Sequence, residues 1–388
     1  MDAGSITVSK RGLDRLRAGH VWIYRSDLTA PDAVAPGARV CVRDAKGRCH
    51  GQAIYSSQSQ IALRLLSREC RAIDKAFLSA RIADADAYRK RIVQDSEAYR
   101  LVSSEGDLLP SLIIDRYAGC FSIQTLSQGM ENLKSELVEI LREQFSPQAV
   151  VERNDAGVRA LEGLPQQKGV VDGELPREVV AKMNGMKFAF DLLGGQKTGG
   201  FLDQRENQAA ARHYAHGRAL DVFAYNGGFA ITLAPQCESV VAVETSEEAL
   251  ALARRNQELN ALANLDWRAA NGFDFLKAAD QARERFDTIV LDPPPFARAK
   301  SNLESALRGY KELNLRALKL LNPSGYLVTC SCSFHVSESD FLSAIADAAL
   351  DARRSVTVVE RRAQARDHPI LLTVPETHYL KCLILRVI

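Results

Sequence analysis

Residues 218–229 read RALDVFAYNGGF, and this stretch decides the fold expected for the second half of the chain. An apolar run that carries Asp221 and ends at Phe223 stops at the turn Asn226-Gly227-Gly228, and a second apolar segment follows at once. A strand, a glycine turn and a helix in this order form the first unit of a doubly wound sheet, where the turn lies close to a nucleotide-like ligand. The glycine spacing is not G-x-G-x-x-G, so a dinucleotide is not the expected ligand.

Strand-like and helix-like segments alternate from this stretch to the C-terminus. We expect strands at 239–243, 267–270, 286–291, 326–329 and 379–387, and helices at 205–214, 246–261 and 303–321. This alternation predicts an α/β fold with a mostly parallel sheet, whose site lies at the carboxyl ends of the strands. Only the last strand is expected at an antiparallel position.

Polar residues follow three successive strands at that edge of the sheet. Glu244 ends the second strand, where a carboxylate suits the hydroxyl groups of a ribose. Asn271-Gly272-Phe273 follows the third strand, and Asp292 with three prolines follows the fourth. A cofactor with a single nucleoside, such as S-adenosylmethionine, fits this order better than NAD does.

A second glycine-rich stretch, GGQKTGGFLDQREN, lies at 194–207 beside the start of a predicted helix. Its glycines and polar side chains indicate backbone folded over a ligand, and the helix start favours an anionic group such as a carboxylate. The candidate binding residues are Lys197, Thr198, Gln204 and Arg205. The alternative is an ordinary flexible connection between domains.

Two cysteines, Cys330 and Cys332, are expected just past the end of a strand, opposite Asp292. A cysteine at this edge would suit methylation of cytosine. C5 of cytosine is a poor nucleophile, so a methyltransferase acting there first adds a cysteine thiolate to C6. Asp292 is placed to protonate or hydrogen-bond the N3 edge of the base. The alternative is that both cysteines are small buried residues, and strand alternation cannot choose between them because residues two apart face the same side.

The first 75 residues carry the positive charge of the chain. They hold 13 Lys and Arg against 7 Asp and Glu, a net charge of +6, whereas the whole chain has a formal charge of +2. Such a distribution fits a polyanion-binding module attached to a near-neutral enzyme, although a solvated basic surface would have the same composition.

Short alternating runs between residues 5 and 70 predict a small β-rich unit with one helix at 12–22. The basic residues Arg15, Arg17 and His20 lie close to Trp22 and Tyr24 in the sequence. Basic side chains suit RNA phosphates and flat rings stack on exposed bases. The alternative is that both aromatic residues belong to the core.

A helix is expected at 73–93 and a small α+β unit at 95–190. Within that unit the patterns predict a helix at 131–145, a strand at 149–152 and a hairpin at Asn184-Gly185.

The eight cysteines show neither a C-x-x-C pair nor the spacing of a zinc site, so no metal is expected. The N-terminus lacks the apolar core of a signal peptide, and no run of about 20 apolar residues offers a membrane span. We therefore expect a cytoplasmic protein with reduced thiols and no membrane partner.

The stretch KRGLDRLRAGHVWIYRSDL resembles the opening of the PUA domain, a small RNA-binding barrel. Nearly the whole chain is similar to the bacterial large-subunit ribosomal RNA cytosine-C5 methyltransferases, with EGDLLPSLIIDRY, DVFAYNGGFA, LDPPPFARAK, TCSCS and DHPILLTVPETHYLK in family order. The resemblance implies a PUA-like barrel at 1–72, an α+β middle domain with a helical linker at 73–190, and a Rossmann-like class I methyltransferase domain at 191–388.

By this resemblance Asp221 and the glycine turn hold the methionine part of S-adenosylmethionine, Glu244 the ribose, and Asn271 with Phe273 the adenine. Asn271 departs from the acid more usual at its position. Cys332 is the implied nucleophile and Cys330 a structural residue. The complete set of expected cofactor-binding residues is Lys197, Thr198, Gln204, Arg205, Asp221, Phe223, Asn226, Gly227, Glu244, Asn271, Gly272, Phe273 and Asp292. The expected RNA-binding residues are Arg11, Arg15, Arg17, His20, Arg298 and Lys300, of which the last two are alternatively solvated loop charges.

The function expected is formation of 5-methylcytosine in 23S rRNA, or in a precursor of the large subunit, through an adduct between Cys332 and C6. Whether the chain forms a homodimer stays open. One alternative is an amino-group methyltransferase of adenine or guanine, which commonly has an aromatic residue where this chain has Pro295. Another is an inactive RNA-binding factor of ribosome assembly. A small-molecule methyltransferase would leave the basic N-terminal unit unexplained.

Overall fold

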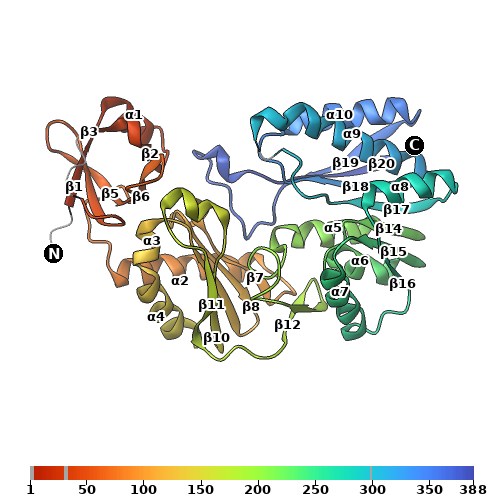
Figure 1. Ribbon diagram of the computed structural model, residues 1–388, viewed down its shortest axis with the longest axis horizontal. Helices are drawn as coiled ribbons and strands as arrows, with labels where there is room; N and C mark the ends of the chain where they lie inside the picture. Colours follow the sequence, from red (N-terminus) through yellow and green to blue (C-terminus); the bar gives the residue numbers. More distant parts are fainter. Residues whose placement is uncertain (1–3, 30–33, 298) are drawn as a thin grey trace. The chain divides into compact units, whose positions relative to one another are not determined.

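The computed structural model describes residues 4–29, 34–297 and 299–388. The chain divides into two compact units, each built from segments that are not contiguous in the sequence (Figure 1). The first unit contains Met1–Ala181, Phe190–Leu202 and Arg366–Thr377, and the second contains Lys182–Ala189, Asp203–Ala365 and His378–Ile388. Two short later segments, Phe190–Leu202 and Arg366–Thr377, therefore belong to the first unit.

Six strands of the first unit form one sheet in the order β2-β6-β5-β4-β1-β3. They are β1 (Gly4–Val8), β2 (Trp22–Tyr24), β3 (Leu28–Thr29), β4 (Arg39–Arg43), β5 (Cys49–Tyr55) and β6 (Ile61–Ser67). Alternate residues such as Ile6, Val8, Val40, Val42 and Leu63 are buried together. This is the β-rich unit that the alternation predicts.

The helix of this sheet, α1 (Lys10–Arg17), begins and ends earlier than the predicted 12–22. Ser9 caps it, because its hydroxyl accepts a hydrogen bond from the backbone N–H of Gly12 at 3.2 Å. Gly19 takes the chain out of the helix with a φ of +95°. Trp22 consequently lies in β2, where its indole N–H donates to Glu105 Oε1 at 2.9 Å.

A second sheet, in the order β11-β10-β9-β8-β7, forms the expected α+β middle part. Its strands are β7 (Ala98–Ser103), β8 (Leu112–Tyr117), β9 (Cys120–Thr125), β10 (Ala149–Asn154) and β11 (Gln167–Gly173). Helices α2 (Lys75–Ile92) and α4 (Lys134–Phe145) contribute Phe77, Ile82 and Leu137 to its core. The predicted helix at 131–145 starts later than expected because a separate short helix, α3 (Gln128–Asn132), precedes it.

The hairpin expected at Asn184-Gly185 joins β12 (Val179–Met183) to β13 (Met186–Phe190), which form a sheet of their own. Both turn residues have positive φ, at +54° and +79°. Two left-handed residues in succession match the turn that Asn-Gly favours in hairpins.

The second unit contains a seven-stranded sheet in the order β16-β15-β14-β17-β18-β20-β19. The strands are β14 (Arg218–Val222), β15 (Ser239–Glu244), β16 (Leu265–Ala269), β17 (Phe286–Leu291), β18 (Leu321–Ser331), β19 (Val356–Arg362) and β20 (Lys381–Val387). The strands from β16 to β18 are parallel, and β20 is antiparallel to both its neighbours, as expected for the last strand. The strand order reverses between β14 and β17, which is where ligands bind in such sheets.

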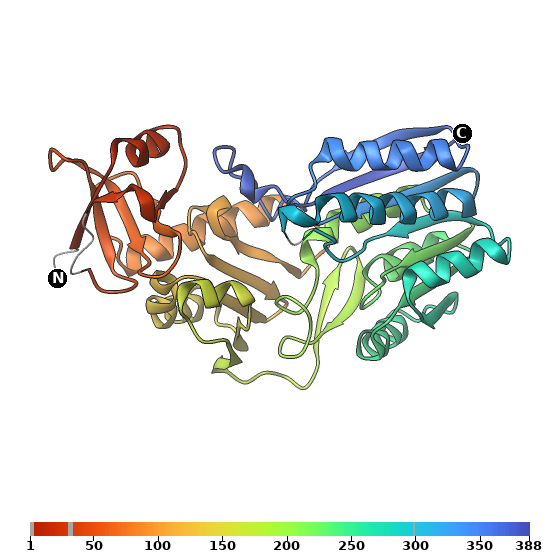
Figure 2. The same cartoon turned by 45° about the horizontal axis from the view of Figure 1, so that its top comes forward.

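Helices cover both faces of this sheet (Figure 2). On one face lie α8 (Gly272–Gln281), α9 (Leu303–Leu320) and α10 (Glu338–Asp351), and on the other α5 (Arg205–Tyr214) and α6 (Gly228–Leu233). A further helix, α7 (Glu247–Leu259), joins β15 to β16. The elements α8, α10 and β19 have no counterpart among the expected segments. In the part of the chain that the structure describes, every helix is too short or too polar to cross a membrane.

The expectation that all thiols are reduced is wrong for Cys49 and Cys70, which form a disulfide. Cys41 joins them, because β4 and β5 pair in antiparallel fashion, and the three sulfur atoms lie within 4.8 Å of one another. The sheet brings these cysteines together, so their spacing along the sequence gives no sign of it.

Candidate active site

The turn between β14 and α6 has an unusual backbone conformation. Phe223, Tyr225 and Gly227 have φ angles of +70°, +48° and +85°, and Asn226 between them is buried. Positive φ is costly for residues with a side chain, so the surrounding structure must hold the turn in place. A Cβ atom on Gly227 would lie 2.7 Å from Cη2 of Trp267, so only glycine fits there.

Asp221 lies buried below this turn. Its Oδ2 accepts a hydrogen bond from the backbone N–H of Ala230 at 2.9 Å, and among the described residues its buried Oδ1 has no hydrogen-bond partner. Burial, with smaller contributions from the Asp292 and Glu244 carboxylates, raises the pKa of Asp221 to about 8. A buried acceptor without a partner marks a place where a donor group of a ligand is expected.

Glu244 is fixed beside the same turn by backbone N–H groups. Its Oε2 accepts from Tyr225 at 2.9 Å, and its Oε1 accepts from Thr245 at 2.7 Å and Ser246 at 3.0 Å. Oε1 also accepts from the Thr245 hydroxyl at 3.1 Å, so the remaining acceptor capacity of Glu244 lies at Oε2, which can receive a hydrogen bond from a hydroxyl group.

Asn271 is the N-cap of α8, where its Oδ1 accepts from the backbone N–H of Phe273 at 2.9 Å. The cap occupies the carbonyl oxygen and leaves the amide NH₂ as the donor that a ligand would meet. Gly272 permits a close approach, because a Cβ there would lie 2.8 Å from Cζ of Phe223. The rings of Phe223 and Phe273 meet edge to face, with centroids 6.4 Å apart, and form an apolar wall beside Asn271.

A chain of polar side chains holds Asp292, which follows β17. Gln204 Nε2 donates to Asp292 Oδ1 at 2.8 Å, and Asn207 Nδ2 donates to Gln204 Oε1 at 2.7 Å. Arg362 Nε in turn donates to Asn207 Oδ1 at 2.9 Å. The structure thus brings Gln204, one of the predicted site residues, directly to Asp292.

The two cysteines of the TCSCS run have different surroundings. Cys332 follows the end of β18, is half-buried, and has its Sγ 3.7 Å from the carbonyl oxygen of Pro293. The expectation that both cysteines lie past the strand end is wrong for Cys330, which is completely buried within β18 opposite Cys382. Burial raises the pKa of the Cys330 thiol well above its ordinary value. Strand alternation cannot make this distinction because the strand ends at Ser331.

Ser333 ties the loop after β18 to the loop after β17. Its Oγ accepts hydrogen bonds from the backbone N–H groups of Phe296 at 3.0 Å and Ala297 at 3.2 Å, and lies 2.9 Å from the Tyr310 hydroxyl. Neither Ser333 nor Tyr310 is among the predicted site residues. Ser333 could have been found from the sequence because it belongs to the TCSCS run. Tyr310 could not, because its position in α9 shows only the apolar spacing of a helix.

Known proteins match this chain along most of its length. Residues 6–68 match the family of PUA-like domains, and residues 170–386 match that of S-adenosylmethionine-dependent methyltransferases. Two proteins called ribosomal RNA large subunit methyltransferase I, from Citrobacter koseri and Tolumonas auensis, are 39% and 40% identical to the chain. The matches cover 93% and 95% of this chain and 94% and 96% of those proteins. The chain belongs to the ribosomal RNA large subunit methyltransferase I family.

The fold of this methyltransferase recurs in solved structures of low sequence identity. A crystal structure described as a methyltransferase complexed with S-adenosylhomocysteine has a TM-score of 0.84 at 21% identity, covering 99% of this chain and 100% of that one. A protein from Streptococcus mutans described as a SAM-dependent methyltransferase gives 0.81 at 20% identity, with coverage of 99% and 100%. The class I methyltransferase fold and the PUA-like N-terminal domain that the sequence predicts are confirmed.

S-adenosylmethionine is the cofactor of this methyltransferase family, and the residues around the turn fit it. The unpartnered Oδ1 of Asp221 would accept from the α-ammonium group, and Glu244 would accept from the ribose hydroxyls. The wall of Phe223 and Phe273, with the Asn271 amide, would face the adenine. When bound, the cofactor supplies an electrophilic methyl group.

The remaining predicted cofactor residues of the methyltransferase are Lys197, Thr198 and Arg205. Thr198 belongs to the first unit, where its hydroxyl donates to Asp115 Oδ2 at 2.5 Å. Lys197, in the same unit, has its Nζ 4.4 Å from the centroid of the Phe201 ring. Arg205 is buried at the start of α5 in the second unit. Thr198 therefore has a visible role within the first unit, on the middle sheet.

The arginines predicted to bind RNA already have partners on the barrel. Arg11 Nε lies 2.5 Å from Asp27 Oδ1, and the guanidinium of Arg15 lies 4.3 Å from the centroid of the Tyr24 ring. Arg17 is exposed and pairs with an aspartate three residues before it. An exposed pair such as that of Arg17 is weak, so its guanidinium group can also bind a phosphate.

The other predicted RNA-binding residues are His20, Arg298 and Lys300. His20 Nδ1 lies 3.0 Å from the backbone N–H of Trp22, and burial lowers the pKa of the imidazole. Arg298 lies outside the described residues. The backbone of Lys300 is part of a short 3₁₀ turn, Lys300–Asn302.

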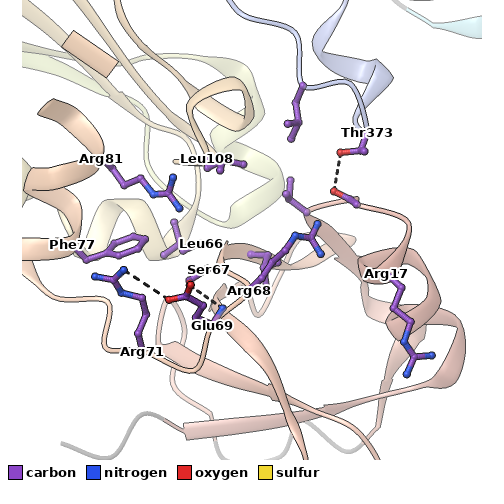
Figure 3. Close-up of a pocket in the computed structure, with 14 residues that line it drawn as sticks. Arg17, Leu66, Ser67, Arg68, Glu69, Arg71, Phe77, Arg81, Leu108 and Thr373 are labelled. Carbon is purple, nitrogen blue, oxygen red and sulfur yellow. Dashed lines mark hydrogen bonds and ion pairs between the residues drawn. The ribbon is translucent and has the colours of Figure 1, made fainter. Parts of the chain in front are cut away.

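A basic pocket in the first unit was not among the predicted sites (Figure 3). This arginine pocket is a cavity of about 680 Å³, and its basic lining consists of Arg17, Arg68, Arg71 and Arg81. Among the side chains that line it, Glu69 is the acidic one, and Leu66 and Phe77 form part of its apolar lining. The guanidinium groups of Arg71 and Arg81 lie 5.1 Å and 5.3 Å from the centroid of Phe77. The net positive charge of the first 75 residues is the sequence feature that indicated a polyanion-binding surface in this unit.

Proposed function

We propose that the protein methylates C5 of a cytosine in 23S rRNA, with Cys332 as the nucleophile. The relatives from Citrobacter koseri and Tolumonas auensis are named for ribosomal RNA of the large subunit. The observation that carries the proposal is the position of Cys332, which is half-buried beside the loop of Asp292 while Cys330 is sealed in the core. A nucleophilic thiol needs this partial exposure, because the cytosine of the RNA must be able to reach it.

In the proposed reaction the Cys332 thiolate bonds to C6, and the electron pair of the C5–C6 double bond moves towards C5. Asp292 protonates or hydrogen-bonds the N3 edge as negative charge builds there. C5 then takes the methyl group and gives its proton to a base. The electron pair of that C–H bond restores the double bond, the S–C6 bond breaks, and Cys332 leaves as a thiolate.

We also propose that RNA binds to the first unit through the arginine pocket and through the arginines of α1. Four arginines line one cavity, and arginine side chains favour phosphate oxygens; Arg71 and Arg81 are held in place over Phe77. Arg298 and Lys300, which follow Asp292 closely in the sequence, are also proposed to bind phosphates. In this proposal residues 1–72 and 73–190 hold the RNA and residues 191–388 transfer the methyl group.

The test is transfer of a tritiated methyl group to unmodified large-subunit RNA, followed by nucleoside analysis. We expect 5-methylcytosine with the wild type and with Cys330→Ala, and no product with Cys332→Ala. Methylated adenine or guanine, or full activity of Cys332→Ala, would overturn the proposal. RNA binding without any methyl transfer would indicate an assembly factor. Loss of activity in Cys330→Ala alone would mean that the two cysteines have the opposite roles.

A further inference from the structure

Lys381 of β20 is a buried lysine that no step of the proposed reaction uses. It is 5% exposed, and the antiparallel pairing of β18 with β20 places it opposite Ser331, the residue before Cys332. Lysine is rarely buried without a partner, because moving an ammonium group out of water is costly. Its position therefore needs a reason.

Two backbone carbonyl groups hold the side chain of Lys381. Its Nζ donates to the carbonyl oxygen of Ser333 at 2.7 Å and to that of Tyr379 at 3.0 Å. The first of these acceptors belongs to the residue after Cys332, so the ammonium group is anchored at the loop that carries the thiol. Among the described residues no carboxylate lies within ion-pair distance of Nζ.

The Cys332 sulfur and the Glu338 carboxylate are the groups whose negative charge acts on the pKa of Lys381. Burial lowers the pKa of Lys381 to about 8, whereas negative charge on Cys332 or Glu338 raises it. A negative sulfur at Cys332 and the ammonium group of Lys381 therefore stabilise each other. At neutral pH the lysine still carries its charge.

We propose that the ammonium group of Lys381 is the positioning and charge partner of the Cys332 thiolate. This inference rests on the proposed role of Cys332 as the nucleophile. The ammonium group stabilises the negative sulfur before it bonds to C6, and again when the S–C6 bond breaks and its electron pair returns to sulfur. Through the Ser333 carbonyl it also fixes the loop on which the thiol lies.

The test is the pH dependence of iodoacetamide alkylation at Cys332, measured by mass spectrometry on the full chain. We expect wild-type Cys332 to titrate below the value of about 8.5 for an ordinary cysteine. In Lys381→Met its apparent pKa should rise by about one unit or more, which slows alkylation at neutral pH about tenfold. Lys381→Arg should restore most of the rate because the charge is kept. Lys311→Met, which removes a half-buried lysine of α9 that pairs with Asp351, should have no effect.

Equal titration curves for the wild type and Lys381→Met would overturn the inference. If Lys381→Met does not fold, the pH dependence of alkylation in the wild type tests the inference by itself. A measured Cys332 pKa at or above about 8.5 would then contradict it. Alkylation requires neither RNA nor methyl transfer. Methylation activity in Cys332→Ala would therefore contradict the proposed function. An unchanged pH dependence of alkylation in Lys381→Met would contradict only the proposed role of Lys381.

Discussion

The side-chain amide of Gln204 donates a 2.8 Å hydrogen bond to the Asp292 carboxylate. The two residues are far apart in the sequence and belong to two separate motifs. Asn207 orients the amide, because its own NH₂ group donates to Gln204 Oε1 at 2.7 Å. Gln204 therefore presents its NH₂ group to Asp292 and fixes the carboxylate that we propose meets the N3 edge of the base.

Replacing Gln204 by alanine is expected to lower kcat for RNA methylation about 10- to 100-fold. A hydrogen bond to a charged group is worth about 1.5–3 kcal/mol, and its loss leaves Asp292 without its orienting donor. Steady-state kinetics with saturating S-adenosylmethionine would measure the effect. Gln236→Ala removes an exposed glutamine of the same unit and should leave kcat unchanged. An unchanged kcat in Gln204→Ala would show that the hydrogen bond has no part in the reaction.

Cofactor affinity is expected to rise with pH between about 6 and 8, because the Asp221 carboxyl has a pKa of about 8. Below that pH the empty site holds a neutral carboxyl, which must lose its proton to bind an ammonium group. Calorimetry with S-adenosylhomocysteine should show up to about tenfold tighter binding per pH unit in the wild type. Asp221→Asn should bind more weakly and show no such dependence. A flat profile in the wild type would contradict the assignment of Asp221 to the ammonium group.

The raised pKa of Asp221 also predicts how the stability of the protein depends on pH. Above about pH 4, the ordinary value for aspartate, the unfolded chain loses the Asp221 proton, whereas the folded chain keeps it up to about pH 8. The free energy of unfolding should therefore fall as pH rises through this window. Denaturant titrations of the second unit's unfolding should show a smaller pH dependence in Asp221→Asn. An equal slope in both proteins would mean that Asp221 titrates normally.

The sequence predicted six of the seven strands in the large sheet of the second unit, all except β19, because glycine turns and apolar runs delimit them. β17 has the bounds expected, and Asp292 follows it directly. The contacts of the site were harder to predict. Ser333 and Lys381 act through backbone groups of neighbouring loops, and such contacts depend on which strands pair. Cys330 and Cys332 differ because β18 ends between them, and strand ends are the least predictable feature of a pattern.

Substituting Gly227 by alanine should weaken both folding and cofactor binding. The φ of +85° costs alanine about 1–2 kcal/mol, and its Cβ would also meet Trp267 at 2.7 Å. Gly47→Ala is the matched control, because Gly47 has a φ of +78° but nothing within 4 Å of the added Cβ. Thermal unfolding and S-adenosylhomocysteine binding would be compared. Equal losses in both variants would mean that backbone strain alone, and not the contact with Trp267, requires glycine.

Removing two charges from the arginine pocket should reduce RNA affinity and its salt dependence together. Each phosphate contact to single-stranded RNA contributes about 0.7 to the slope of log K against log salt concentration, so Arg71→Gln with Arg81→Gln should lower the slope by about 1.4. Filter binding of large-subunit RNA at several salt concentrations would measure it.

The control is Arg308→Gln, which removes an exposed arginine of α9 in the second unit and should leave RNA affinity unchanged. Because the pocket belongs entirely to the first unit, S-adenosylhomocysteine affinity should be the same in all variants. A lower affinity with an unchanged salt slope would mean that Arg71 and Arg81 support Phe77 and do not contact phosphates. An unchanged affinity would place the RNA elsewhere on the first unit, with the arginines of α1 as the next candidates.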